Sequence, residues 1–136
     1  MALDYGEVRI GIAMSDLLQT IASPFQTYKR KGEEQDINFF KNLIKENEVV
    51  KIIIGMPLNM DGSEGDRAFK TKEFGQKLKD ACGLEIEYVD ERLTSVEAEE
   101  MLIQSGMRRE KRKEVIDKIA AALILESYLN RISYWK

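Results

Sequence analysis

Large apolar residues alternate with small or charged ones near the start of the chain, and this alternation predicts a strand. It follows the two-residue period of a half-buried strand, and the large residues are Val8, Ile10, Ile12 and Met14. A short apolar run before them leads into Asp4 and then Gly6, where we expect a turn with positive φ. The pattern predicts a hairpin with Asp4 at its mouth, although this acid could also serve only to form the turn.

Strand-like and helix-like patterns alternate through the middle of the chain. Residues 21–28 resemble a strand, in which Pro24 indicates an edge position or a bulge. Apolar residues at helical spacing predict a helix over 34–47, and acids in its first turn suit the helix dipole. Residues 49–54 are mostly β-branched, which is typical of a central strand covered on both faces.

The remaining sequence predicts one more strand and three helices. A capping box of Ser63 and Asp66 would begin the first helix, which ends near residue 81. A strand then runs into Asp90 and Glu91, and Thr94 would begin a second helix that stops near residue 106. A third helix is expected from about 114 to 131, with a core stripe of Ile116, Ile119, Ala120, Leu123, Ser127 and Tyr128.

This order of elements predicts an α/β protein with a mixed sheet. Three meandering strands followed by strand–helix–strand crossovers place helices against the sheet. A chain of 136 residues suits a single domain, which we expect to span 1–136. No apolar run approaches the roughly 20 residues of a membrane span, and no signal peptide opens the sequence. We therefore expect a cytoplasmic protein with no membrane partner.

The sequence contains no histidine, which excludes serine–histidine and cysteine–histidine catalysis and the usual zinc sites. An enzyme of this composition must work with carboxylates, lysine or a bound metal. The net charge of −3 argues against a uniformly basic nucleic-acid binder but leaves room for local basic regions. The single cysteine, Cys82, is expected only to pack.

Three acidic sites stand at the ends of predicted elements. They are Asp4, the pair Asp90 and Glu91, and Asp117. Strand ends on one edge of an α/β sheet converge, and a helix across the sheet can add a further carboxylate. Gathered carboxylates repel one another unless cations neutralise them, and oxygen ligands suit Mg²⁺ or Mn²⁺, so a two-ion site is one interpretation. The other is that these acids cap helices or lie on the surface.

A basic run precedes the helix that carries Asp117. Residues 107–113 hold five bases and one acid. Such a run is often a solvated loop. If Asp117 lies in an active site, the run borders that site and could grip phosphates, and the candidate residues are Arg108, Arg109, Lys111 and Arg112.

Four sequence blocks together resemble the YqgF/RuvX family. They are Asp4-Tyr5-Gly6 with Arg9-Ile10-Gly11-Ile12-Ala13 and Ser15-Asp16; Gly55-Met56-Pro57-Leu58-Asn59-Met60-Asp61-Gly62-Ser63; Asp90-Glu91-Arg92-Leu93-Thr94; and Asp117-Lys118-Ile119-Ala120-Ala121 with Ile124-Leu125. The blocks span nearly the whole chain, in the order that the family has them.

The resemblance implies an RNase H-like fold, a five-stranded mixed sheet with helices on both faces, related to RuvC resolvases. It also implies a nuclease that processes the 5′ end of pre-16S ribosomal RNA. By this analogy Asp4, Glu91 and Asp117 are the catalytic carboxylates and the ligands of two Mg²⁺ or Mn²⁺ ions, while Arg92 and the loop from Asn59 to Ser63 line the site. We expect Glu91 rather than Asp90 to be the ligand, because neighbouring strand residues point to opposite faces.

Other functions remain open at this point. Holliday-junction resolution uses the same chemistry on branched DNA and would require a dimer, so the sequence leaves a monomer and a homodimer as alternatives. We expect pre-rRNA in preference to branched DNA as the partner. An actin-like ATPase also has a first-strand Asp-x-Gly, but it needs a far longer chain. A non-catalytic binding module is the third alternative.

Overall fold

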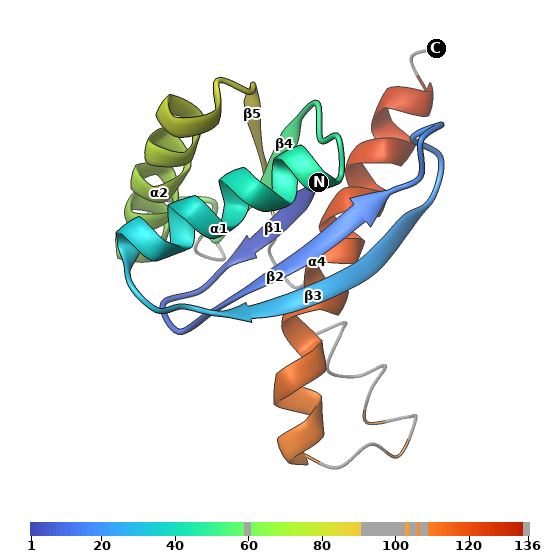
Figure 1. The fold of residues 1–136 in the computed structure, drawn as a ribbon. Coiled ribbons are helices and arrows are strands. Elements are labelled where there is room, and N and C mark those ends of the chain that lie inside the picture. Colours follow the sequence, from blue (N-terminus) through green and yellow to red (C-terminus); the bar gives the residue numbers. More distant parts are fainter. Residues whose placement is uncertain (59–60, 91–102, 104–105, 107–108, 135–136) are drawn as a thin grey trace.

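Five strands and three helices make up the described part of a computed structural model of the chain (Figure 1). The structure describes residues 1–136 except 59–60, 91–102, 104–105, 107–108 and 135–136. In chain order the elements are β1 (Ala2–Tyr5), β2 (Arg9–Ser15), β3 (Ala22–Lys29), α1 (Glu33–Glu46), β4 (Ile52–Met56), α2 (Asp66–Cys82), β5 (Ile86–Asp90) and α4 (Arg109–Tyr134). The helix predicted from Thr94 falls mainly outside these residues.

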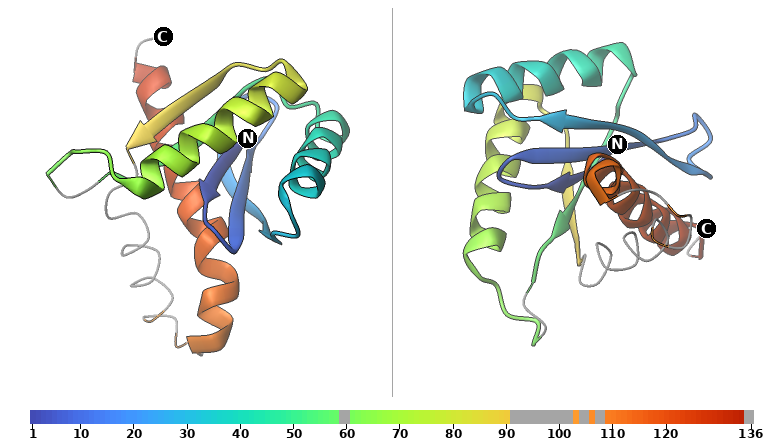
Figure 2. Two further views of the ribbon diagram at one scale, coloured as in Figure 1. Left: turned by 90° about the vertical axis from the view of Figure 1, so that its left-hand side faces the viewer. Right: turned by 90° about the horizontal axis from the view of Figure 1, so that it is seen from below.

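The strands form one mixed sheet in the order β3-β2-β1-β4-β5. β1 pairs antiparallel with β2, and β2 pairs antiparallel with β3, as a meander requires. β1 and β5 both pair parallel with β4, because each connection to or from β4 passes through a helix. α1 and α2 cover one face of the sheet and α4 crosses the other (Figures 1 and 2). The prediction of a five-stranded mixed sheet with helices on both faces is confirmed.

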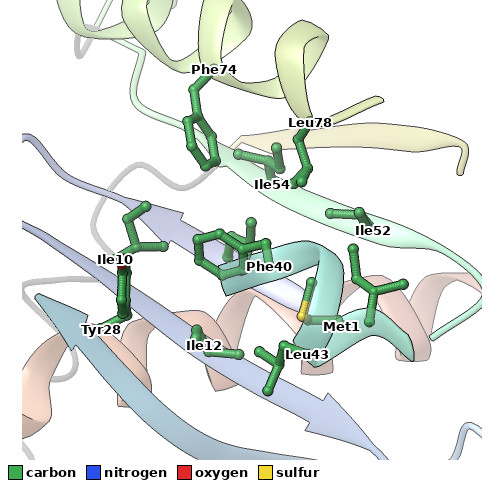
Figure 3. Packing of buried hydrophobic residues seen from close by; sticks show 12 residues of the cluster. Met1, Ile10, Ile12, Tyr28, Phe40, Leu43, Ile52, Ile54, Phe74 and Leu78 are labelled. Atoms are coloured by element: carbon green, nitrogen blue, oxygen red, sulfur yellow. The ribbon is translucent and has the colours of Figure 1, made fainter. Parts of the chain in front are cut away.

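Large side chains fill the face under α1 and α2 (Figure 3). Alternate residues of the strands supply Leu3, Ile10, Ile12, Ile52 and Ile54, each fully buried. The helices contribute Phe40, Leu43, Phe74 and Leu78. The period-2 pattern of the sequence therefore marked one real face of the sheet.

Small side chains dominate the face under α4. Ala2 and Ala13 of the strands meet Ala121 and Ala122 of the helix, which allows the helix axis to approach closely. Ala120 and Tyr128 are buried as predicted, but Ser127 is exposed, so the core stripe predicted for this helix is partly wrong. The buried positions that it missed are Ala121, Ala122, Ile124, Leu125 and Leu129.

Pro24 lies where the sequence indicated. β3 is an edge strand, and its pairing with β2 shifts register between Ile12 and Ala13, so that Pro24 rather than Phe25 faces Ala13. Phe25 is therefore the extra residue of a bulge. Both predictions for this strand are confirmed.

Three local predictions are wrong for identifiable reasons. Gly6 is not among the positive-φ residues of the described chain; a Cβ there would instead lie 2.5 Å from the carbonyl oxygen of Arg9. Ser63 does not cap α2, since Gly65 is its N-cap and the Ser63 hydroxyl donates to Asp61 Oδ1 at 2.6 Å. The long last helix begins at Arg109 rather than near 114, so residues 109–113 of the basic run are helical.

No helix in the described part of the chain is long and apolar enough to cross a membrane.

Candidate active site

Asp4 lies inside β1 and faces α4. It pairs directly with Gly11 of β2, and its side chain belongs to the same face as Ala2, which packs under α4. Only 8% of Asp4 is exposed, although it carries a carboxylate. A buried acid within a strand is not a turn former, so the alternative that Asp4 merely shapes the turn does not fit this position.

Gly11 allows α4 to pack closely against the sheet beside Asp4. A Cβ at Gly11 would lie 1.9 Å from the carbonyl oxygen of Asp117 and 2.8 Å from the amide nitrogen of Lys118. Only a residue without a side chain permits this approach. Directly opposed residues of an antiparallel pair have Cβ positions about 5 Å apart, so the backbone of Asp117 lies beside Asp4. The structure therefore brings together two of the acids that the sequence marked.

Arg9 adds a cation that the sequence analysis did not include among the site residues. Its Nε donates a hydrogen bond to Oδ2 of Asp117 at 2.8 Å, in an ion pair whose side chains are 39% and 21% exposed. Arg9 stands two residues before Gly11 and hence on the same face of β2, diagonal to Asp4. Arg9 and Gly11 are two residues apart in a predicted strand and so share a face. This spacing was the sequence signal that could have placed Arg9 in the site.

The third acid of the predicted trio, Glu91, follows the described part of β5 in the sequence. Glu91 and Arg92 are outside the described residues, and β5 ends at Asp90, which pairs with Met56. Val89 packs in the cluster under α4, whereas Tyr88 packs against the cluster under α1 and α2. Neighbouring residues of a strand point to opposite faces, so Asp90, which follows Val89, belongs to the face of the sheet opposite Asp4.

The remaining predicted site residues are only partly described. Asn59 and Arg108 lie outside the described residues. Ser63 is exposed and bonds to Asp61. Arg109, Lys111 and Arg112 lie in the first turns of α4, which extend past the sheet in Figure 1. A role for these residues in binding substrate stays a prediction.

A buried polar network holds the turn that follows Asp4. Arg30 Nη1 donates to the hydroxyl of Tyr5 at 2.7 Å and to the carbonyl of Gly6 at 3.3 Å. Its Nε donates to Asp36 Oδ2 at 2.9 Å, and Asp36, in the first turn of α1, is fully buried. The hydroxyl of Tyr28 donates to Asp36 Oδ1 at 2.8 Å. Asp36 was predicted only as a helix-dipole acid, because the sequence pattern does not show that the end of β3 and the segment after it fold back onto the start of α1.

The network also sets the ionisation of its members. Burial alone would raise the pKa of Asp36, but hydrogen bonds from the Lys31 amide, Arg30 and Tyr28 outweigh burial and lower this pKa below its usual value. Burial, together with the hydrogen bond to Asp36, raises the pKa of Tyr28 to about 12. Asp36 is therefore ionised in the folded protein near neutral pH.

A cavity of about 570 Å³ lies away from these acids. Its walls come from the chain start, the end of β2, the segment before β4 and the second half of α4. Neither Asp4 nor Asp117 lines it. We place the candidate site at the crossing of β1, β2 and α4, because the ionisable side chains gather there.

The carboxylates there are suitable donors for a hard divalent cation. Asp4 and Asp117 offer oxygen atoms, the ligands that Mg²⁺ and Mn²⁺ prefer. Within the described residues no group of three or more acidic or cysteine side chains is arranged to hold a metal ion; two members of the predicted trio belong to these residues, and Glu91 does not.

Comparisons with known proteins bear on this arrangement. A family model described as "RuvX: Holliday junction resolvase" matches residues 1–131. The chain belongs to the RuvX family. A protein of Halothermothrix orenii named "Putative pre-16S rRNA nuclease" is 49% identical over 130 residues, which cover 96% of this chain and 93% of that protein. A RuvX relative of the same name from Syntrophus aciditrophicus is 43% identical over 136 residues, covering 100% and 91%.

A solved structure shares the fold of this RuvX chain. T. thermophilus RuvC in complex with a Holliday junction substrate superposes with a TM-score of 0.55 at 11% identity, over 96% of this chain and 92% of that one. This likeness confirms the RNase H-like α/β fold that the sequence resemblance implied.

Proposed function

We propose that this RuvX protein is a nuclease that hydrolyses phosphodiester bonds in structured RNA and processes the 5′ end of pre-16S rRNA in the cytoplasm. The observation that carries the proposal is the contact of the Asp117 backbone with Gly11, directly opposite the buried Asp4. This contact supports a site in which carboxylates hold divalent cations, and metal-assisted hydrolysis of that kind needs no histidine. The names of the relatives supply the substrate class.

We infer that Asp4, Glu91 and Asp117 hold Mg²⁺ or Mn²⁺. The nearly buried carboxylate of Asp4 fits this role, since an acid at 8% exposure within a strand is costly unless a cation or donors compensate its charge. A bound pair of ions would activate water and stabilise the leaving oxygen. The parity of Val89 and Asp90 favours Glu91 as the third ligand.

The chain's own bases would bind the RNA backbone. Arg109, Lys111 and Arg112 start α4 where it extends past the sheet (Figure 1). With Arg108 they would neutralise phosphates on the approach to Asp117. Arg92 and the loop from Asn59 to Ser63 would line the site, as the family resemblance suggests.

Resolution of Holliday junctions is the second candidate. The family description and the RuvC complex with junction DNA both favour it. A two-fold symmetric junction requires two active sites, so this activity would need a homodimer, whereas rRNA processing would allow a monomer.

A cleavage assay on two substrates tests the proposal. A 5′-extended 16S rRNA fragment and a synthetic four-way DNA junction would be incubated with wild type and with Asp4→Asn, in EDTA, Mg²⁺ or Mn²⁺. Asp80→Asn is the matched control, because Asp80 is an exposed acid of α2. We expect metal-dependent RNA cleavage by wild type and Asp80→Asn and none by Asp4→Asn.

The other outcomes separate the candidates. If the protein cleaves only the DNA junction and sediments as a dimer, junction resolution rather than rRNA processing is its function. Binding of either substrate without cleavage in any metal would indicate a non-catalytic module.

A further inference from the structure

Two basic side chains lie opposite each other beside the candidate site. Arg9 of β2 pairs directly with Lys29 of β3, so the two side chains belong to the same face of the sheet. The next pairing on this face joins Gly11 to Thr27, and Gly11 in turn faces Asp4. Arg9 and Lys29 thus form a row one step from the row that contains Asp4 and the Asp117 backbone.

This arrangement is costly unless an anion compensates it. Like charges directly opposed in an antiparallel pair destabilise a sheet. The ion pairs found among the described residues give Arg9 one carboxylate, Asp117, and give Lys29 none. Lys29 is exposed and Arg9 is 39% exposed, so both can reach a ligand from solvent.

The bond to Asp117 also orients the arginine. It uses Nε, one of the five N–H donors of a planar guanidinium, and the hydrogen bonds found among the described residues use neither Nη group of Arg9. A guanidinium held in this way offers a fork of N–H groups that matches phosphate oxygens. Lys29 adds a point charge that requires no fixed geometry.

We propose that Arg9 and Lys29 form a phosphate-binding subsite for the nucleic-acid backbone next to the carboxylates, with Asp117 orienting Arg9. The inference rests on the proposed nuclease function and deepens it, since it assigns substrate contact to two residues of the β2–β3 hairpin. The phosphate bound there would lie adjacent to the one that is hydrolysed.

The test is the salt dependence of RNA binding in EDTA, which avoids cleavage. The probe is a fluorescent RNA hairpin with a single-stranded 5′ extension, titrated with Arg9→Gln/Lys29→Gln at several salt concentrations. The control is Arg131→Gln/Lys79→Gln, which removes the same charge elsewhere: Arg131 pairs with Glu87 at 2.7 Å, as Arg9 pairs with Asp117, and Lys79 is an exposed base of α2. Each removed phosphate contact should lower the slope by about 0.7 to 0.9.

We expect weaker binding and a slope smaller by roughly 1.5 for the Arg9 and Lys29 variant, and a slope close to wild type for the control. Arg9→Lys/Lys29→Arg, which keeps both charges, should restore most of the slope if the loss is one of phosphate contact rather than of folding. Equal slopes for the two glutamine variants would overturn the inference alone. Absence of salt-dependent binding by wild type would overturn the nuclease proposal and this inference together.

Discussion

Gly11 is the residue that sets how closely α4 approaches the sheet. Asp4 is opposite it and the Asp117 backbone lies over it, so the position of both acids depends on a missing side chain. The sequence showed Gly11 only as one small residue in an alternating strand. Its importance follows from a contact with a helix that begins almost a hundred residues later, which no local pattern can reveal.

We therefore predict that Gly11→Ala moves or loosens α4. A methyl group 1.9 Å from the Asp117 carbonyl oxygen cannot be accommodated without backbone shifts, and overpacking of this kind costs about 1–3 kcal/mol or more. Urea denaturation measures the loss. Gly83→Ala is the control, since a Cβ there would have no neighbour within 4 Å and the left-handed φ of 73° is its only penalty. Equal losses in the two variants would contradict the close crossing.

Asp36 is a second residue whose role depends on the fold, although its hydrogen-bond donors lie only five to eight residues before it in the sequence. Its carboxylate accepts hydrogen bonds from Tyr28, Arg30 and the Lys31 amide, and Arg30 continues the network to the turn after Asp4. Since the folded pKa of Asp36 is lowered, ionisation of this group stabilises the fold above its unfolded pKa of about 3.9. That stability is lost as the pH falls through the folded pKa.

Asp36→Asn should therefore lower the free energy of unfolding near neutral pH by about 3 kcal/mol, because it leaves the half-buried Arg30 without its carboxylate. It should also flatten the fall in stability below about pH 4. Chemical denaturation from pH 7 down to the acid limit measures both effects. An Asp36→Asn protein with wild-type stability and the wild-type acid dependence would show that this network does not hold the fold.

At the level of elements, the alternation of side chains between the two faces of β5 decides whether Asp90 or Glu91 belongs to the face of Asp4. Val89 belongs to the α4 side and Tyr88 to the other, so Asp90 has the wrong parity and Glu91 would have the right one if the strand continued. The sequence shows the same alternation but not which face of the strand each residue lies on. The contacts of Val89 and Tyr88 supply that missing fact.

We predict that Glu91→Gln loses nearly all cleavage activity, whereas Asp90→Asn keeps much more of it. Both variants must retain the wild-type melting temperature, since either acid could instead cap the helix predicted from Thr94. Initial rates of RNA cleavage in Mn²⁺ make the comparison. Equal inactivity, or the reverse order, would mean that a bulge changes the parity after β5.

At the scale of the whole molecule, hydrophobic periodicity was sufficient for the architecture. Strand and helix patterns such as those of residues 8–14 and 34–47 gave the elements, and Pro24 marked the edge strand and its bulge. Two failures depend on tertiary contacts: the core side of α4 and the ion pair between Arg9 and Asp117. Burial and packing of α4 against the sheet decide these, and neither is encoded within a short window. The failed cap of α2 has a local cause, since Ser63 bonds to Asp61 and Gly65 is the N-cap.

The residues of the candidate site also fall into those that the sequence marked and those that only the fold reveals. Element ends and residue type singled out Asp4 and Asp117, and the crossing at Gly11 brings them together. Arg9 and Lys29 escaped notice because isolated bases in strands look like ordinary surface residues. The assignment of Glu91 and of the basic run to the site stays a prediction.

The measurement that tests the central claim most directly is the melting temperature of wild type, Asp4→Asn and Asp80→Asn across a Mn²⁺ titration, starting from EDTA. If Asp4 holds a cation, wild type and Asp80→Asn should gain stability with metal, by about 2.7 kcal/mol at a hundredfold excess over Kd. Asp4→Asn should be at least as stable as wild type in EDTA, because one buried charge is gone, and should gain much less from Mn²⁺. The same metal-induced shift in Asp4→Asn as in wild type would contradict a shared metal site at Asp4.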